Sequence, residues 1–318
     1  MMSRDARLCI VVAVCVSACV PNGTIGDTEH YDRPVAGDLR LRLRAVRDIA
    51  VLNEPIVLAF SVENVTNHRL VAQMRMDASA LRLVISTEGA PAVTTRSAFA
   101  EEDTEGRPEL YLGPREVVEE SAGLFYGSTQ QGRLFPRTGK YRIRGEMEVG
   151  TENGSIRLTD EIDVEVTPES ADDDEFVKRL GAESDLISVL RSPELFCDGG
   201  SRRACVERLV SIARECARSS YAPIVFVGAV GMMEQPAART VEGTSTQRLL
   251  EMWEESLRRW PGSATRALVM FATARSLMEV GRTQESAAMI KKYEAEFPHR
   301  RQQVHYLHAS VLREPRPR

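Results

Sequence analysis

The chain has 318 residues and a mass of 35.4 kDa, enough for one large domain or two of medium size. Its content of 43% hydrophobic and 27% charged residues is typical of a folded protein and excludes a disordered or fibrous chain. The net charge of -5 and the aromatic content of 6% argue against a general nucleic-acid-binding surface, because such surfaces are basic or rich in stacking aromatics. We therefore expect no nucleic-acid partner.

The N-terminus has the features of an export signal. A short basic stretch precedes an apolar run from Leu8 to Ala18, which is shorter than the roughly 20 residues that a membrane-spanning helix needs. The run ends in Val16-Ser17-Ala18-Cys19, which resembles the lipobox of bacterial lipoproteins. The resemblance implies that residues 1–18 are a signal peptide and that Cys19 is the lipidation site. An ordinary secretory signal cleaved after Ala18 is the alternative.

The segment after the cysteine predicts the cellular location. Residues 20–37 are rich in Pro, Gly, Asn, Thr and Asp and have no periodicity, so we expect residues 19–37 to form a lipidated, flexible tether. In lipoproteins of the kind that the lipobox resembles, Asp after the cysteine retains the protein at the inner membrane. Val20 stands there instead. We therefore expect a cell-envelope protein held by a lipid anchor, at the outer membrane rather than the inner.

Residues 38–168 show the period-two pattern of strands with one buried face. Turn residues such as Asn53-Glu54-Pro55 and Asn153-Gly154 separate the runs, and no helical pattern lies between them. This predicts an antiparallel β-sandwich. The row formed by Arg40, Arg42 and Arg44 is interpreted as a solvated strand face, paired with acids such as Glu146 or Asp163, rather than as an anion site.

Three segments carry a resemblance to a known fold. Leu52–Leu58, Leu112-Gly113-Pro114 and Phe135–Tyr141 resemble the corresponding elements of immunoglobulin-like domains in bacterial envelope proteins. The resemblance implies an immunoglobulin-like sandwich whose Tyr141 packs at a corner. Such domains bind proteins, separate other domains from a membrane, or inhibit proteases through their loops.

After Pro168 the period becomes helical, which predicts an all-α domain over residues 169–318. The acidic stretch 169–174 is interpreted as the cap of a helix that continues to about Leu190, and a second helix is expected over 201–219. The aromatic-proline pairs Trp260-Pro261 and Phe297-Pro298 lie 37 residues apart. Residues 244–313 thereby resemble divergent tetratricopeptide repeats of bacterial envelope lipoproteins, although an ordinary helical bundle gives the same spacing.

The predicted mature chain keeps three cysteines besides Cys19. Cys205 and Cys216 are eleven residues apart on one expected helix, roughly 16 Å, which is too far for a disulfide. Cys197 precedes that helix, so a disulfide is expected between Cys197 and Cys205 in an oxidising compartment. The alternative is that all three remain thiols.

No catalytic residue or cofactor site emerges from the sequence. His305 and His308 could share a helix face, but no convincing third ligand accompanies them, so no metal site is expected. The pattern favours a non-catalytic interaction or scaffold lipoprotein whose partner is another envelope protein or peptide. The alternative is an inhibitor or regulator of an exported protease that acts through loops around residues 98–108.

Overall fold

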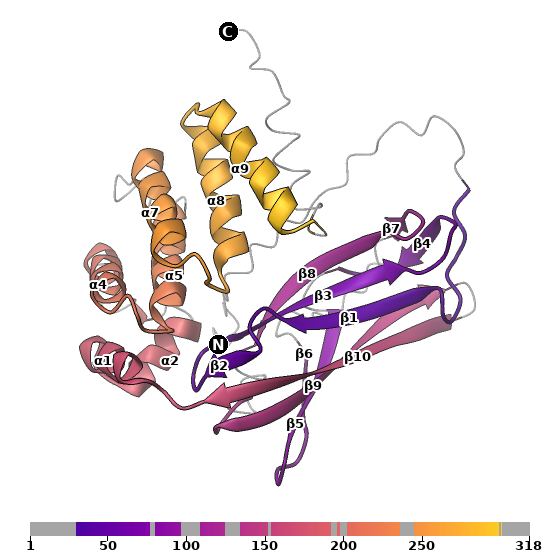
Figure 1. The fold of residues 1–318 in the computed structure, drawn as a ribbon, viewed down its shortest axis with the longest axis horizontal. Coiled ribbons are helices and arrows are strands. Elements are labelled where there is room, and N and C mark those ends of the chain that lie inside the picture. Colours follow the sequence, from indigo (N-terminus) through magenta and orange to yellow (C-terminus); the bar gives the residue numbers. More distant parts are fainter. Residues whose placement is uncertain are drawn as a thin grey trace, which may run out of the picture. The chain divides into compact units, whose positions relative to one another are not determined.

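The computed structural model (Figure 1) describes a large part of the chain from His30 onward. The described residues are 30–76, 80–96, 109–124, 134–151, 154–191, 196–197, 202–235, 245–298 and 300. They divide into two compact units. The β unit contains the described residues up to Thr167 together with Arg300, and the helical unit contains Pro168–Pro298.

The strands of the β unit are β1 (Leu39–Ala45), β2 (Ile49–Val51), β3 (Ile56–Asn64), β4 (Leu70–Gln73), β5 (Leu81–Thr87), β6 (Val93–Arg96), β7 (Glu109–Leu112), β8 (Val117–Leu124), β9 (Gly139–Thr151) and β10 (Gly154–Thr167). The smaller sheet has the order β1-β3-β8 and is antiparallel. The larger sheet has the order β2-β10-β9-β4-β7, and β5 joins it by pairing with β9 and with β6.

The expected fold class, an immunoglobulin-like antiparallel β-sandwich followed by an all-α tetratricopeptide-like domain, is wrong. The larger sheet is mixed, because β2 runs parallel to β10 with Ala50 opposite Val166. The described part of the chain is a mixed α/β protein with parallel and antiparallel pairing and seven helices. Alternation shows which side chains a strand buries, but not which strand it pairs with or in which direction. β2 has only three residues, too few to display a period.

Buried side chains from both sheets form one core cluster. In β1 the leucines point inward and Arg40, Arg42 and Arg44 point outward, as their alternation predicts. Tyr141 begins the buried face of β9 and is only 1% exposed. Its hydroxyl donates a hydrogen bond to the carbonyl oxygen of Arg137 at 2.7 Å, and its ring meets Phe135 edge-on. The loop that enters β9 is therefore fixed to the core.

β1 is an edge strand of the smaller sheet, and part of its edge is occupied by a side chain of the larger sheet. The backbone N–H of Leu43 donates a hydrogen bond to Oδ2 of Asp160 in β10 at 2.7 Å. The side chain of Leu43 lies over Gly145 in β9, where an added Cβ would come within 2.7 Å of Leu43 Cδ1. The close approach of β1 to the larger sheet therefore favours glycine at this position, because a larger residue would force the leucine side chains to shift.

The helical unit contains α1 (Ala171–Leu180), α2 (Glu183–Arg191), α4 (Arg202–Glu215), α5 (Ala222–Glu234), α7 (Thr246–Arg259), α8 (Arg266–Glu279) and α9 (Thr283–Glu296). The single helix expected up to about Leu190 is interrupted at Gly181, which ends α1 with a φ of 136°. The start of α1 is an N-terminal capping box between Ser170 and Asp173, so the acidic stretch does cap a helix.

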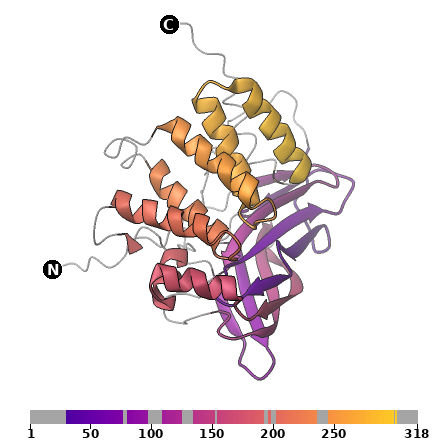
Figure 2. The ribbon, with the colours of Figure 1, turned by 60° about the vertical axis from the view of Figure 1, so that its left-hand side comes forward.

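Consecutive helices from α4 onward pack against one another, α4 on α5, α5 on α7, α7 on α8 and α8 on α9. Figure 2 shows the helices α8 and α9, coloured toward the yellow end of the scale, side by side. α7 and α9 end at the aromatic-proline pairs with nearly identical backbone angles, φ -129° and ψ 63° at Trp260, and φ -128° and ψ 63° at Phe297. In the described part of the chain, no helix is both long and apolar enough to cross a membrane.

Candidate functional site

A groove with a volume of about 340 Å³ lies in the helical unit between α4, α5 and α7. This volume is at the lower end of the range for small-ligand sites. The floor is apolar and consists of Val206, Val210, Met233 and Met252. The walls are charged and consist of Glu207, Arg214, Arg248, Glu251, Glu255 and Arg258. Such a groove suits a ligand that combines apolar and charged groups.

The spacing of residues along α4 and α7 produces the groove. Two ion pairs connect the helices, Arg248 with Glu207 at 3.6 Å and Arg214 with Glu255 at 2.6 Å. From the first pair to the second, the residue on α4 and the residue on α7 each advance by seven positions, which is two helical turns or about 10.5 Å. The two helices therefore run in the same direction, and the pairs lie at two levels along the groove. Ser245 fixes the start of α7 by accepting a hydrogen bond from the N–H of Arg248.

Glu255 is the most enclosed acidic group of the groove, with a side chain that is 15% exposed. Burial by itself raises the pKa of its carboxyl group, but hydrogen bonds from Arg214 and Arg259 and their charges outweigh it, so the pKa is lowered. Glu255 is therefore ionised at neutral pH and held by two guanidinium groups. The ion pair between Arg214 and Glu255 thereby fixes one wall of the groove.

Arg258 differs from the other two groove arginines. It is exposed in the last turn of α7, and it makes no ion pair or hydrogen bond within the described residues. A cation at a helix C-terminus is favoured by the helix dipole, which explains its presence without a ligand. Its guanidinium nevertheless remains available to a carboxylate or phosphate at this end of the groove.

The opposite end of the groove is loosely closed. Arg248 and Glu207 are each 46% exposed and their charged atoms are 3.6 Å apart, and such surface pairs contribute only about 0–1 kcal/mol. A ligand can displace them at little cost and reach the apolar floor. Met233 and Met252 in that floor have flexible side chains, which adapt to differently shaped apolar groups.

The structure brings the predicted disulfide partners together. Cys197 and Cys205 are bonded with a Cα–Cα distance of 5.6 Å. Cys205 lies in the first turns of α4, directly before Val206 in the groove floor. The bond therefore ties the preceding segment to the end of α4 that lines the groove.

Cys216 is a buried free thiol at the end of α4. Burial raises the pKa of its thiol, and a raised pKa leaves little reactive thiolate at neutral pH. The side chain behaves as a small apolar residue of the core.

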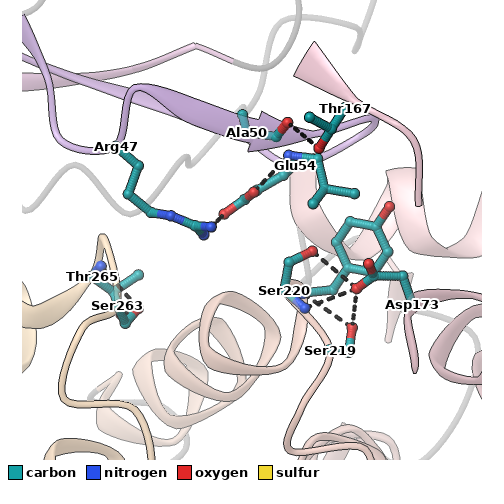
Figure 3. A network of polar contacts seen from close by, with 11 residues as sticks. Arg47, Ala50, Glu54, Thr167, Asp173, Ser219, Ser220, Ser263 and Thr265 are labelled. Carbon is teal, nitrogen blue, oxygen red and sulfur yellow. Dashed lines mark hydrogen bonds and ion pairs between the residues drawn. The ribbon is translucent and has the colours of Figure 1, made fainter. Parts of the chain in front are cut away.

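Asp173 is buried, but its contacts are structural. Figure 3 shows its carboxylate against Ser219 and Ser220 in the connection between α4 and α5. Ser170 donates two further hydrogen bonds, from its N–H and its hydroxyl. Burial raises the pKa of Asp173, but these hydrogen bonds together lower it. In the β unit, the same figure shows Glu54, which is buried and accepts a hydrogen bond from Arg47 at 2.7 Å.

Several residues singled out from the sequence lie outside the described residues. They are Cys19, His305, His308 and the loop over residues 98–108. Within the described ranges, no group of three or more His, Cys, Asp or Glu side chains is arranged to hold a metal ion.

The arginine row of β1 does lie beside acids, but not beside the expected ones. Arg40 is 3.6 Å from Glu63 in β3, and Arg44 is 3.1 Å from Glu119 in β8. The acids expected to face the row pair elsewhere, Glu146 with Arg82 and Asp163 with Arg142.

Comparison with known proteins gives no family. No family model matches the chain, and no curated protein matches it. Similar solved structures include the sporulation control protein of Bacillus subtilis, with 9% identity and a TM-score of 0.27 over 45% of this chain and 54% of that one. A β-glucosidase from Listeria innocua in complex with laminaribiose has 15% identity and a TM-score of 0.24 over 41% of this chain and 16% of that one.

An alkylpurine DNA glycosylase from Pseudomonas fluorescens, bound to DNA with an abasic site analogue, has 14% identity and a TM-score of 0.25 over 41% of this chain and 30% of that one. The chain thus spans from about a sixth to about half of the length of these three proteins. Likeness at this level carries no argument about function.

Proposed function

We propose that the protein is a non-catalytic, lipid-anchored protein of the cell envelope that binds a segment of another envelope protein in the groove between α4, α5 and α7. The groove is the observation that carries the proposal. It combines an apolar floor, a wall fixed by the Arg214–Glu255 pair, and a weak Arg248–Glu207 pair that a ligand can displace.

The groove favours a particular partner chemistry. Apolar side chains of the bound segment replace water on the methionine and valine floor, and each buried CH₂ contributes about 0.8 kcal/mol. An acidic residue near one end of the segment meets the guanidinium of Arg258. The proposed ligand is therefore a peptide segment with a few apolar side chains followed or preceded by an acid.

Photo-cross-linking in intact cells tests the groove. A photoreactive residue replaces Glu251, which is exposed on the groove wall, and in a second strain it replaces Glu175, which is exposed on α1. We expect a discrete cross-linked protein from position 251 and none from position 175. The same products from both positions, or none from either, would argue against a ligand in the groove.

Charge reversal tests the role of Arg258. Because Arg258 has no partner in the described residues, Arg258→Glu leaves the fold intact and lowers the yield of the product formed from position 251. Arg218→Glu is the matched control, since Arg218 is also an exposed arginine but lies outside the groove lining. Equal yields in the two variants would remove Arg258 from the binding site.

The anchor is proposed from the lipobox-like motif that ends at Cys19. A cysteine of this kind would carry a diacylglycerol and an amide-linked acyl chain. Several acyl chains on one residue hold a protein firmly, because each acyl CH₂ placed in the membrane adds about 0.8 kcal/mol. Mass spectrometry of the mature N-terminus tests this, with a lipid-modified Cys19 as the expected result. Cys19→Ala releases the protein from membranes, and retention of the unmodified variant would contradict the proposal.

A further inference from the structure

The β unit carries a small exposed apolar surface beside the place where the described chain begins. Val35, Ile49 and Tyr111 are the exposed large hydrophobic residues of the described chain, at 64%, 51% and 52%. Val35 is two residues from Arg33 and Tyr111 is two residues from Glu109, and Arg33 and Glu109 form an ion pair at 2.8 Å, so both belong to the same edge of the β unit. Ile49 lies on β2, at the other end of the strand order from β7.

Tyr31 completes this surface, which we call the aromatic patch (Tyr31, Val35 and Tyr111). The rings of Tyr31 and Tyr111 meet edge-on with centroids 5.1 Å apart. The guanidinium of Arg69 lies 5.9 Å from the centroid of Tyr31. The hydroxyl of Tyr111 donates a hydrogen bond to Glu109 at 2.7 Å, so its polar end is bonded while half of the side chain stays exposed.

Val35 is the first residue of a turn that spans residues 35–38. Its N–H donates to the carboxylate of Asp38 at 2.8 Å, and the N–H of Asp38 donates back to the carbonyl oxygen of Val35. The side chain of Val35 is thereby presented to solvent on a fixed backbone. An exposed apolar side chain four residues along the chain from one of two contacting tyrosines is typical of surfaces at the boundary of lipid headgroups and acyl chains.

The chain itself brings this patch close to a membrane. Residues 30–37, expected to belong to the tether, run beside β4, since Asp32 forms a parallel bridge with Leu70 and its N–H donates to Arg69. Only about ten residues separate the proposed anchor at Cys19 from His30, which corresponds to a reach of roughly 18 Å on average and about 35 Å at most. β4 and β7 are at the upper right of the β unit in Figure 1, at the end where the described chain begins.

From this placement we propose that the aromatic patch contacts the phospholipid bilayer and orients the β unit on its surface. The proposal rests on the lipid anchor proposed above. The charge of Arg33 is paired with Glu109 and the apolar and aromatic side chains make the contact, so it does not require anionic lipid. It therefore persists at high salt and in vesicles of zwitterionic lipid.

Tryptophan quenching by brominated lipids tests the contact in the full chain. Val35→Trp places a probe in the patch, and Ile49→Trp is a matched control because both replace an exposed β-branched residue on the β unit. The two natural tryptophans are nearly buried, at 2% and 9% exposure, and supply a constant background. In reconstituted vesicles we expect lipid quenching for Val35→Trp, and for Ile49→Trp only the quenching of the parent protein. Adding Tyr111→Ser to the patch probe lowers its quenching.

The possible results distinguish a failure of the proposed patch contact from a failure of the proposed lipid anchor. Equal quenching of the two probes, in protein that mass spectrometry shows to be lipidated at Cys19, overturns the patch and leaves the anchor standing. If Cys19 carries no lipid, the anchor fails, and the unlipidated protein is mixed with the same vesicles. Quenching of the Val35→Trp probe there supports the patch by itself, and absence of quenching overturns it.

Discussion

Asp173 is expected to stabilise the helical unit more than any neighbouring acid. Its carboxylate accepts hydrogen bonds from two backbone N–H groups and three hydroxyls, contributed by Ser170, Ser219 and Ser220. Asp173→Asn removes the charge and replaces one acceptor oxygen by an NH₂ group. This group is itself a donor, so it cannot accept the hydrogen bonds that the replaced oxygen received. At least one partly buried backbone N–H then loses its partner.

The size of the effect follows from these contacts. Hydrogen bonds to a charged group contribute about 1.5–3 kcal/mol each, and burial of the carboxylate offsets part of the sum. We expect Asp173→Asn to lower the free energy of unfolding by about 3 kcal/mol. The pKa of Asp173 is lowered in the folded protein, so its contribution is complete above the unfolded pKa of about 3.9. The difference from the parent protein should shrink as the pH falls below about 4, because the unfolded chain then binds a proton at this carboxyl before the folded protein does, and it is lost once the pH is below the folded pKa.

Urea unfolding followed by tryptophan fluorescence measures this effect. Both tryptophans, Trp253 and Trp260, lie in the helical unit, so their emission reports on that unit alone. Asp172→Asn is the matched control, because Asp172 is an exposed acid in the same helical turn. If both variants unfold at the same urea concentration at pH 7, the hydrogen bonds of Asp173 do not stabilise the unit and the reasoning is wrong.

Two further predictions concern the disulfide and the strand contact. Reduction, or Cys197→Ser with Cys205→Ser, lowers the free energy of unfolding by about 2.5 kcal/mol, as measured by urea titration with and without reductant. Cys216→Ser is the control, since it keeps the disulfide and should lose as much stability to reductant as the parent protein, and an equal loss from reductant in the double variant would contradict the pairing. Gly145→Ala brings a methyl group against Leu43 and destabilises the β unit by about 1–3 kcal/mol, followed by circular dichroism. Gly262→Ala, where nothing lies within 4 Å, should have little effect, and equal losses would refute the steric argument.

Much of the local structure could be predicted because the side chains that a strand or helix buries recur in the sequence with a fixed period. The alternation in Leu39–Ala45 and in Gly139–Thr151 identifies the buried faces that the structure shows. The parallel position of β2 could not be predicted, since three residues carry no period and the partner strand is more than a hundred residues away. The break at Gly181 had a signal that was missed, a glycine after Lys178 and Arg179 in the last turn of a helix.

The candidate site was largely invisible in the sequence. The disulfide between Cys197 and Cys205 followed from reach along the chain, which is a local property. The groove depends instead on which faces of α4 and α7 meet, and those helices are about forty residues apart. A usable signal was the equal spacing of Glu207 and Arg214 on one helix and of Arg248 and Glu255 on the other. Pairing of this kind fixes a relative register once two helices are known to be neighbours.

The hydrogen bond from Leu43 to Asp160 has a consequence for behaviour at high concentration. An open strand edge attracts the edge of a second molecule through its unused backbone groups, and this is how many β proteins begin to aggregate. In β1 one of those groups is already taken by a carboxylate, which also brings a negative charge toward any strand that approaches. At high concentration, where encounters between copies are frequent, a single well-placed aspartate on this edge opposes such pairing.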